Sequence, residues 1–323
     1  MIAESFPGAS LLRIDPKAET DRIVAGIRDI VFNQLRRRGA VIGVSGGIDS
    51  SVVAFLCARA LGSDRIQILF TPEAESSPDS LRLGRMVADM LKARSAVEDI
   101  SQILEGAGCY KRRDEAIRLV VPEYGENYKS KIVLPSAYDA SRYSIFSIVV
   151  QSPDGKTRKV RLSPEAYLAI VAATNFKQRS RKMIEYHYAD LLQYAVAGTP
   201  NRLEYELGFF VKNGDGSADF KPIAHLYKSQ VFQLADYLGV PREIQERRPT
   251  TDTYTMDQSQ EEFYFMAPLE KVDLCLYGKN NGISVSDLAR LSQMEVQQVE
   301  RMYQMIESSR KVAHYLLSSP IVV

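Results

Sequence analysis

The residues best suited to chemistry in this sequence form one short turn between two apolar segments. The stretch SGGIDSS follows the apolar run AVIGV and precedes VVAFLCARAL. When a strand leads into a helix, the backbone N–H groups of the turn point outward and the helix dipole favours an anion. Gly46 and Gly47 permit close approach of a ligand, and the hydroxyls of Ser45 and Ser50 add donors. We therefore predict phosphate binding here, although two glycines also suit a tight turn without a ligand.

A carboxylate stands inside this predicted anion site. The turn has neither the terminal lysine of GxxxxGK[ST] nor the spacing of GxGxxG, so two common nucleotide-binding loops do not match. Asp49 would repel phosphate unless a divalent cation joined the two. Glu204, on a helix predicted after the apolar strand that Thr199 follows, could face the same crevice, although a solvated glutamate is the alternative. Together Asp49 and Glu204 suit Mg²⁺, which combines few protein oxygens with phosphate oxygens.

Two further polar segments have both a functional and a plain structural interpretation. Arg179 and Arg181 lie in the basic run KQRSRK, which is either a solvated helix face or a pair of guanidinium groups that bind phosphates. Asp215, between two glycines, is either a turn residue or part of a site. The three histidines are dispersed, without the spacing of metal ligands or of a catalytic triad.

Alternating strands and helices must position these residues. Hydrophobic spacing predicts helices at 16–38, 50–61, 77–91, 164–187, after Pro200 and at 229–240, and strands at 39–45, 66–70 and 194–198. This order is typical of an α/β fold with a doubly wound, mostly parallel sheet and helices on both faces. Residues 106–163 interrupt it, and we interpret them as an insertion with a β-hairpin, its strands near 144–150 and 158–162. Two C-terminal helices are expected within 284–323, meeting near Ser292, and 1–323 is expected to form one domain.

Composition excludes several classes of protein. The 323 residues are 45% hydrophobic and carry a formal net charge of +1, which argues against a broad nucleic-acid surface. Cys57, Cys109 and Cys275 are isolated, so neither a disulfide framework nor a structural zinc site is expected. No signal peptide or membrane-spanning run is evident. A cytoplasmic protein without a nucleic-acid or membrane partner is the expectation.

The Ser-Gly-Gly-x-Asp-Ser motif resembles the pyrophosphatase loop, or PP-loop, of enzymes that split ATP between its α and β phosphates and adenylate a substrate. Downstream, NFKQRSR and GTPNRLEYELGFFVKNGDG resemble the N-x-x-x-R-x-R and G-T-x-N-x-x-E…G-x-F-x-K-x-G-D-G segments of the ammonia-dependent NAD synthetase family. The segments YKSQVFQLADYLGVP and RRPTTD match the next two. The resemblance covers roughly 16–106 and 164–262, and it implies an adenine nucleotide alpha hydrolase-like fold.

The resemblance also implies roles for individual residues. It places ATP on Ser45, Gly46, Gly47, Asp49, Ser50, Ser51, Thr199, Lys228 and Thr250. It places deamido-NAD on Arg179, Arg181, Lys212, Asp215, Asp219 and Arg310. Mg²⁺ would lie on Asp49 and Glu204, and the catalytic residues would be Asp49, Lys228 and Asp215.

The implied reaction is the ATP-dependent amidation of deamido-NAD to NAD through an adenylated intermediate, with release of pyrophosphate and AMP. No protein nucleophile is expected. Glutamine-dependent members of the family carry an amidase domain ahead of this loop; because the stretch before the loop is short here, we expect ammonia to arrive free or from a separate protein. Members of the family are homodimers with the dinucleotide substrate at the subunit interface, and we expect the same here.

Two other functions remain open at this stage. The segment 253–278, the 106–163 insertion and the end of the chain, where Arg310 and Lys311 lack a neighbouring histidine, depart from the family pattern. A related PP-loop enzyme that amidates another carboxylic acid or modifies tRNA is therefore one alternative. The other is a nucleotide-binding module without catalysis, in which Asp49, Ser50, Glu204 and Lys228 would have no shared purpose.

Overall fold

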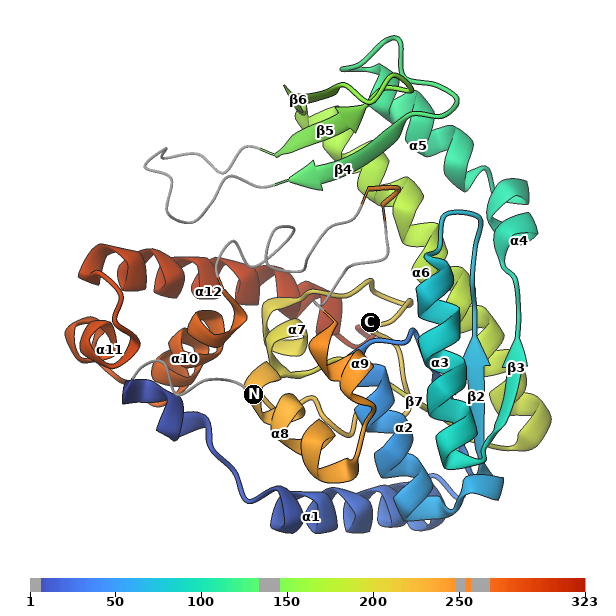
Figure 1. Cartoon of the computed structure of the whole chain (residues 1–323), viewed down its shortest axis with the longest axis vertical. Coiled ribbons are helices and arrows are strands. Elements are labelled where there is room, and N and C mark those ends of the chain that lie inside the picture. Colours follow the sequence, from blue (N-terminus) through green and yellow to red (C-terminus); the bar gives the residue numbers. More distant parts are fainter. Residues whose placement is uncertain (1–6, 134–145, 248–253, 257–267, 323) are drawn as a thin grey trace.

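A computed structural model describes residues 7–133, 146–247, 254–256 and 268–322. Its centre is a parallel sheet of four strands in the order β3–β2–β1–β7. Strands β2, β3 and β7 are labelled in Figure 1. The strands are β1 (Ala40–Gly43), β2 (Ile66–Phe70), β3 (Arg94–Val97) and β7 (Ala195–Ala197). Ile42 pairs with Ile68 on one side and with Ala197 on the other, so β1 lies in the interior of the sheet.

Helices cover both faces of this sheet. One face carries α1 (Pro16–Arg28), α2 (Ile48–Leu61), α3 (Pro78–Leu91) and α8 (Lys228–Leu238). The long helix α6 (Pro164–Leu192) covers the other. Side chains alternate along a strand, so Ile42 packs with the first layer and Val41 packs with Ala189 of α6. The predicted doubly wound α/β fold is thus confirmed.

The strand order creates a crevice beside β1. From β1 the chain runs outward to β2 and β3, and it later returns to β7 on the opposite side of β1. At such a reversal the connections leave the sheet in opposite directions, and the crevice at the carboxyl ends of the strands holds the ligand. The turn before α2 follows β1, and Thr199 follows β7 just before α7 (Arg202–Leu207).

The 106–163 segment follows α4 (Ser101–Gly106) and packs on the first turns of α6 (Figure 1). It contains α5 (Cys109–Arg118) and an antiparallel sheet of β4 (Lys129–Val133), β5 (Ser147–Gln151) and β6 (Thr157–Arg161). Ile132, Ile148 and Val150 join Ile170 of α6 in one apolar cluster. The β5–β6 hairpin is confirmed. Strand β4 and helix α5 were not predicted. In β4, Lys129 and Lys131 interrupt the apolar run, so the sequence does not indicate a strand there.

A helical unit holds the C-terminal part of the chain. It consists of α10 (Leu269–Asn280), α11 (Val285–Ser292) and α12 (Val296–Leu317), which pack with α7 and the short η1 helix (Pro7–Leu12). The two helices predicted near Ser292 are confirmed. Short helices η3 (Ser63–Arg65) and α9 (Arg242–Glu246) complete the elements.

One helix boundary and one strand differ from the prediction. A single α-helix over 16–38 is wrong, because α1 ends at Arg28 and continues as the π-helix η2 (Asp29–Gln34). Arg36 then takes a left-handed conformation with φ 51°, which turns the chain toward β1. Strand β3 was not predicted, since this edge strand is mostly exposed and carries no apolar run. Among the described residues, no helix has the length and apolar character needed to cross a membrane.

The central strand provides a test of the fold. Ile42 is fully buried between β2, β7 and the α1–α2 layer, so Ile42→Ala removes packed methylene groups that no neighbour can replace. We expect the free energy of unfolding to fall by about 2–5 kcal/mol in urea titrations. Met90→Ala, at a side chain 52% exposed on α3, is the control and should change it by less than about 0.5 kcal/mol. An equal effect of both variants would contradict this core.

Candidate active site

The turn between β1 and α2 has the geometry of an anion-binding loop. Gly46 has a φ of 75°, and a Cβ atom there would lie 2.6 Å from the carbonyl oxygen of Ser80, so only glycine fits. Gly47 is the N-cap of α2 and has no side chain to cap the helix. The Ser50 hydroxyl donates to the Gly47 carbonyl (3.1 Å), and Ser45 Oγ lies 3.3 Å from Ser50 Oγ. The N-terminal end of a helix 14 residues long therefore opens toward the crevice.

Asp49, in the first turn of α2, lies at the centre of a group of polar side chains. Its carboxylate forms an ion pair with Nζ of Lys228, the first residue of α8, and accepts a hydrogen bond from Asn201 Nδ2 (3.1 Å). The Lys228 side chain is only 2% exposed. Burial lowers the pKa of Lys228, but the charges of Asp49 and Glu204 raise it more, so the pKa is raised overall. The lysine is therefore a buried cation held by Asp49.

Glu204 completes the group from α7. Its carboxylate accepts from the backbone N–H of Asn201 (3.0 Å), while the Asn201 side chain caps the N–H of Glu204 (3.2 Å). Burial and the nearby Asp49 charge raise the pKa of Glu204 to about 8. Two carboxylates that repel each other in this way are the donor set that a divalent cation stabilises. Within the described ranges no cluster of three or more acidic, histidine or cysteine side chains forms a metal site. These two carboxylates therefore fit Mg²⁺ only together with phosphate oxygens.

A pocket of about 450 Å³ joins these groups. Several predicted site residues line it, namely Ser45, Gly47, Asp49, Ser50, Arg181, Thr199, Glu204, Asp215 and Lys228. Gly46 and Ser51 belong to the same turn, where the buried Ser51 hydroxyl donates to the Gly47 carbonyl (2.8 Å). Asp215 accepts from the backbone N–H of Val211 (2.7 Å), and burial raises its pKa.

Four of the predicted substrate residues lie away from the lining of this pocket. Arg179 is exposed and donates to the Lys212 carbonyl (3.3 Å). The ammonium of Lys212 donates to the Tyr315 carbonyl (2.8 Å) at the end of α12. Asp219 accepts from the backbone N–H of Val196 in β7 (2.7 Å), and Arg310 pairs with Glu206. Within this chain these four side chains bind other groups of the protein and do not line the pocket. Thr250 lies outside the described residues.

The structure adds two pocket residues and one residue behind the pocket that the sequence analysis did not select. On α6, the buried pair Lys182–Glu185 (2.5 Å) lines the pocket beside Arg181. Their spacing from Gln178 follows one helix face, a signal that was available in the sequence. Asp273 of α10 is fully buried and accepts from the backbone N–H groups of Lys228 (3.1 Å) and Ser229 (2.7 Å). It caps α8 although it lies 45 positions later in the sequence, so no local pattern could predict this contact.

Comparisons with known proteins agree with this geometry. A model of the family described as NAD synthase matches residues 19–132 and 153–313. The NH(3)-dependent NAD(+) synthetase of Mesorhizobium japonicum is 55% identical over 312 residues, which cover 97% of this chain and 98% of that protein. The protein of the same name from Rhizobium meliloti is 55% identical over 315 residues, covering 98% and 94%.

Solved structures show the same fold at low identity. The NH3-dependent NAD synthetase from Campylobacter jejuni aligns with a TM-score of 0.63 and 20% identity, covering 96% of this chain and 100% of that one. The NMN synthetase from Francisella tularensis aligns with a TM-score of 0.67 and 22% identity, covering 96% and 99%. Since the family model and the relatives at 55% identity both extend over most of the sequence, the chain belongs to the NAD synthase family.

Proposed function

We propose that this protein is an ammonia-dependent NAD synthetase, which amidates deamido-NAD to NAD with ATP and ammonia. The observation that carries the proposal is the convergence of the 45–51 turn, Asp49, Glu204 and Lys228 at the crevice beside β1. Family membership and relatives named for this reaction support it. A nucleotide-binding module without catalysis would not need a buried lysine between two carboxylates.

The reaction must activate a carboxylate, which is a poor electrophile. A carboxylate oxygen of the nicotinate group attacks the α-phosphorus of ATP. The bond from that phosphorus to the oxygen shared with the β phosphate breaks, and pyrophosphate leaves. Ammonia then attacks the acyl carbon of the mixed anhydride, and AMP leaves with the oxygen that had joined this carbon to phosphorus. The nitrogen loses a proton to give the amide. No step requires a covalent bond to the protein.

The chain's own groups align the reactants and balance charge. We assign the β and γ phosphates to the 45–51 turn, with Thr199 on the opposite side of the crevice and Lys228 beside the phosphate that leaves. Asp49 and Glu204 would hold Mg²⁺, which supplies neutralisation of the polyphosphate when bound. Arg181 and Asp215, in the pocket, would face the acid substrate. Thr250 is retained as a predicted ATP contact.

The function itself has a direct assay. The purified protein with ATP, Mg²⁺, ammonium chloride and deamido-NAD should form NAD, AMP and pyrophosphate in equal amounts, measured by chromatography. Omitting ATP, Mg²⁺ or deamido-NAD should abolish all three products, whereas omitting ammonia should abolish NAD and limit pyrophosphate to about one equivalent per site, because adenylation precedes amide formation. Nicotinate mononucleotide is the comparison substrate. Faster turnover of that smaller acid, or of neither acid, would contradict the proposed substrate while leaving the adenylating chemistry to be tested by pyrophosphate release.

Glu204 and Asp49 should respond differently to loss of charge. Because the pKa of Glu204 is raised to about 8, its carboxyl group is mostly protonated at pH 7 without ligand, and a glutamine resembles that form. Glu204→Gln should therefore change the free energy of unfolding by less than about 1 kcal/mol while it reduces Mg²⁺-dependent turnover at least about 100-fold.

Asp49→Asn should lose both stability and activity. It leaves the buried Lys228 without its ion-pair partner, so we expect a cost of about 3 kcal/mol, with Glu204 ionising to limit it. Denaturant titrations at pH 7 and pyrophosphate release measure the two effects. A Glu204→Gln enzyme with near-full turnover, or an Asp49→Asn enzyme as stable as the parent, would refute this division of roles.

We further propose a homodimer with the acid substrate between subunits. On α6, the exposed Arg179 shares one face with Met183 and Leu191, which are 55% and 67% exposed. Such a face would bury its apolar side chains against a second copy and bring Arg179 to the shared site. Replacing Met183 and Leu191 together by aspartate should convert the dimer to a monomer in sedimentation velocity, whereas Met90→Asp on α3 should not. A parent protein that sediments as a monomer would contradict the proposal.

A further inference from the structure

One wall of the pocket is a loop whose position depends on buried charges. The β2–α3 loop, residues 71–77, connects β2 to α3, and its Thr71, Pro72, Ser76 and Ser77 line the pocket. The loop leads directly into the start of α3, where the Ser80 carbonyl closes on Gly46 of the phosphate-binding turn. A shift of this loop would therefore also move the surface against which that turn packs.

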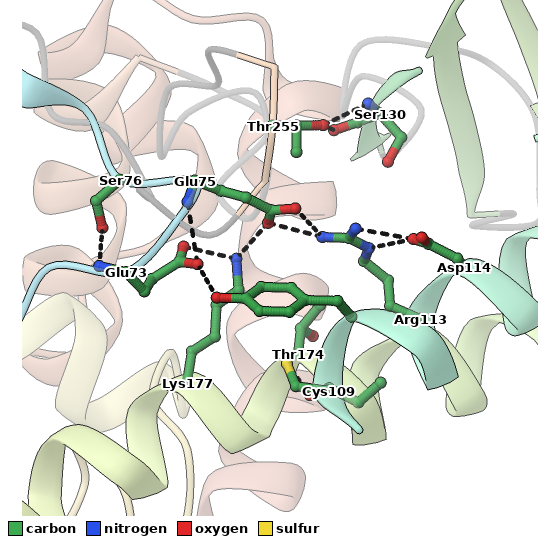
Figure 2. A network of polar contacts seen from close by, with 12 residues as sticks. Glu73, Glu75, Ser76, Cys109, Arg113, Asp114, Ser130, Thr174, Lys177 and Thr255 are labelled. Atoms are coloured by element: carbon green, nitrogen blue, oxygen red, sulfur yellow. Dashed lines mark hydrogen bonds and ion pairs between the residues drawn. The ribbon is translucent and has the colours of Figure 1, made fainter. Parts of the chain in front are cut away.

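The two carboxylates of the loop, Glu73 and Glu75, do not line the pocket, and both contact Lys177 of α6 (Figure 2). Nζ of Lys177 lies 2.9 Å from Glu73 Oε1 and 2.7 Å from Glu75 Oε2. The side chains of Lys177 and Glu73 are only 2% and 1% exposed. Tyr110 of α5 donates its hydroxyl to Glu73 (2.7 Å). The loop is thus anchored on α6 by an almost fully buried cation.

The second anchor comes from the 106–163 segment. Nη1 of Arg113, on α5, lies 2.5 and 2.7 Å from the two Glu75 carboxylate oxygens, and Nε lies 2.9 Å from Asp114 (Figure 2). The Arg113 side chain is 9% exposed. Burial raises the pKa of Glu75, but Lys177 and Arg113 lower it more, so the pKa is lowered overall and the carboxylate stays charged.

The same segment reaches a second wall of the pocket. Tyr254 lines the pocket, and the residues after it are tied to strand β4. The Ser130 backbone N–H donates to Thr255 Oγ1 (2.7 Å; Figure 2). The Met256 backbone N–H donates to the Ser130 carbonyl (3.3 Å). Two separate walls of the pocket therefore depend on contacts from 106–163.

Buried ionic networks of this kind seldom add much stability over apolar packing, but they define one geometry because every charge needs its partner. If the loop only had to pack against the protein, apolar side chains would be enough. The ion pairs of Glu73 and Glu75 with Lys177 and Arg113 instead fix its position. We infer that Arg113 is a positioning residue for the nucleotide pocket, acting through Glu75 on the β2–α3 loop. The segment predicted to be an insertion is then a working part of the active site. This inference rests on the proposed use of ATP.

The test compares Arg113→Gln, Glu75→Gln and the double variant with Arg112→Gln. Arg112 is the adjacent, exposed arginine of α5 and serves as the matched control. The readouts are the Kd for ATP by calorimetry, kcat and KM for ATP in the NAD-forming assay, and the melting temperature. We expect Arg113→Gln to raise the Kd and KM for ATP roughly 10- to 100-fold, since small misplacements of a site have effects of this size.

The double variant distinguishes positioning from general stability. If Arg113 acts through Glu75, the Kd of the double variant for ATP should be no higher than the higher of the two single-variant Kd values. Arg113→Lys should restore part of the affinity, and Arg112→Gln should match the parent. A lowered melting temperature with an unchanged Kd for ATP would overturn the inference, as would fully additive losses.

The parent protein separates this result from the proposed function. A parent that binds ATP but forms no NAD would refute the proposed function, while the ratio of Kd values between Arg113→Gln and the parent would still decide the inference. A parent that does not bind ATP would overturn both, because the pocket would then not be a nucleotide site.

Discussion

The ion pair between Asp49 and Lys228 is the interaction on which the rest of the site depends. A lysine that is 2% exposed needs a negative partner, and the partner lies in the first turn of α2, the helix that follows the 45–51 turn. Asn201, the N-cap of α7 on the other side of the crevice, donates to the second oxygen of the same carboxylate. One carboxylate thus joins α2, α7 and α8, so the site cannot change shape unless these helices move together.

This arrangement also explains why the ligand-free site tolerates so much charge. Asp49 neutralises Lys228, and the raised pKa of Glu204 keeps the second carboxyl group protonated near neutral pH. The site is therefore close to neutral before ligand binds. A polyphosphate and a divalent cation would enter as a pair of opposite charges, which lets Glu204 ionise and Lys228 turn to phosphate without leaving any buried charge unbalanced.

The parts of the fold that follow local rules could be predicted from the sequence. Apolar runs such as Ile66–Phe70 and the glycines before α2 encode a strand and a turn through neighbouring residues alone. The bounds of β2 agree with the prediction, and α2 begins at Ile48, two residues before its predicted start. Strand β3 and strand β4 carry charged residues at an edge or in a small sheet, so their pairing partners decide their conformation. The π-helical end of α1 likewise depends on where β1 must begin.

The site likewise has one part that local sequence predicts and another that depends on residues distant in sequence. The 45–51 turn is one contiguous stretch, and its glycines and hydroxyls suggest phosphate without any tertiary information. Asp273 capping α8, or Arg113 reaching Glu75, joins residues 45 and 38 positions apart in sequence through a fold that no short pattern describes. Binding of phosphate needs only the contiguous part. Exact placement of the α-phosphorus against an incoming carboxylate requires walls fixed to fractions of an ångström, and in this chain those walls are held by the distant residues. Variation in Asp273 or in the 106–163 segment should therefore change both the affinity and the alignment of the whole nucleotide, whereas the 45–51 turn keeps its own local contacts.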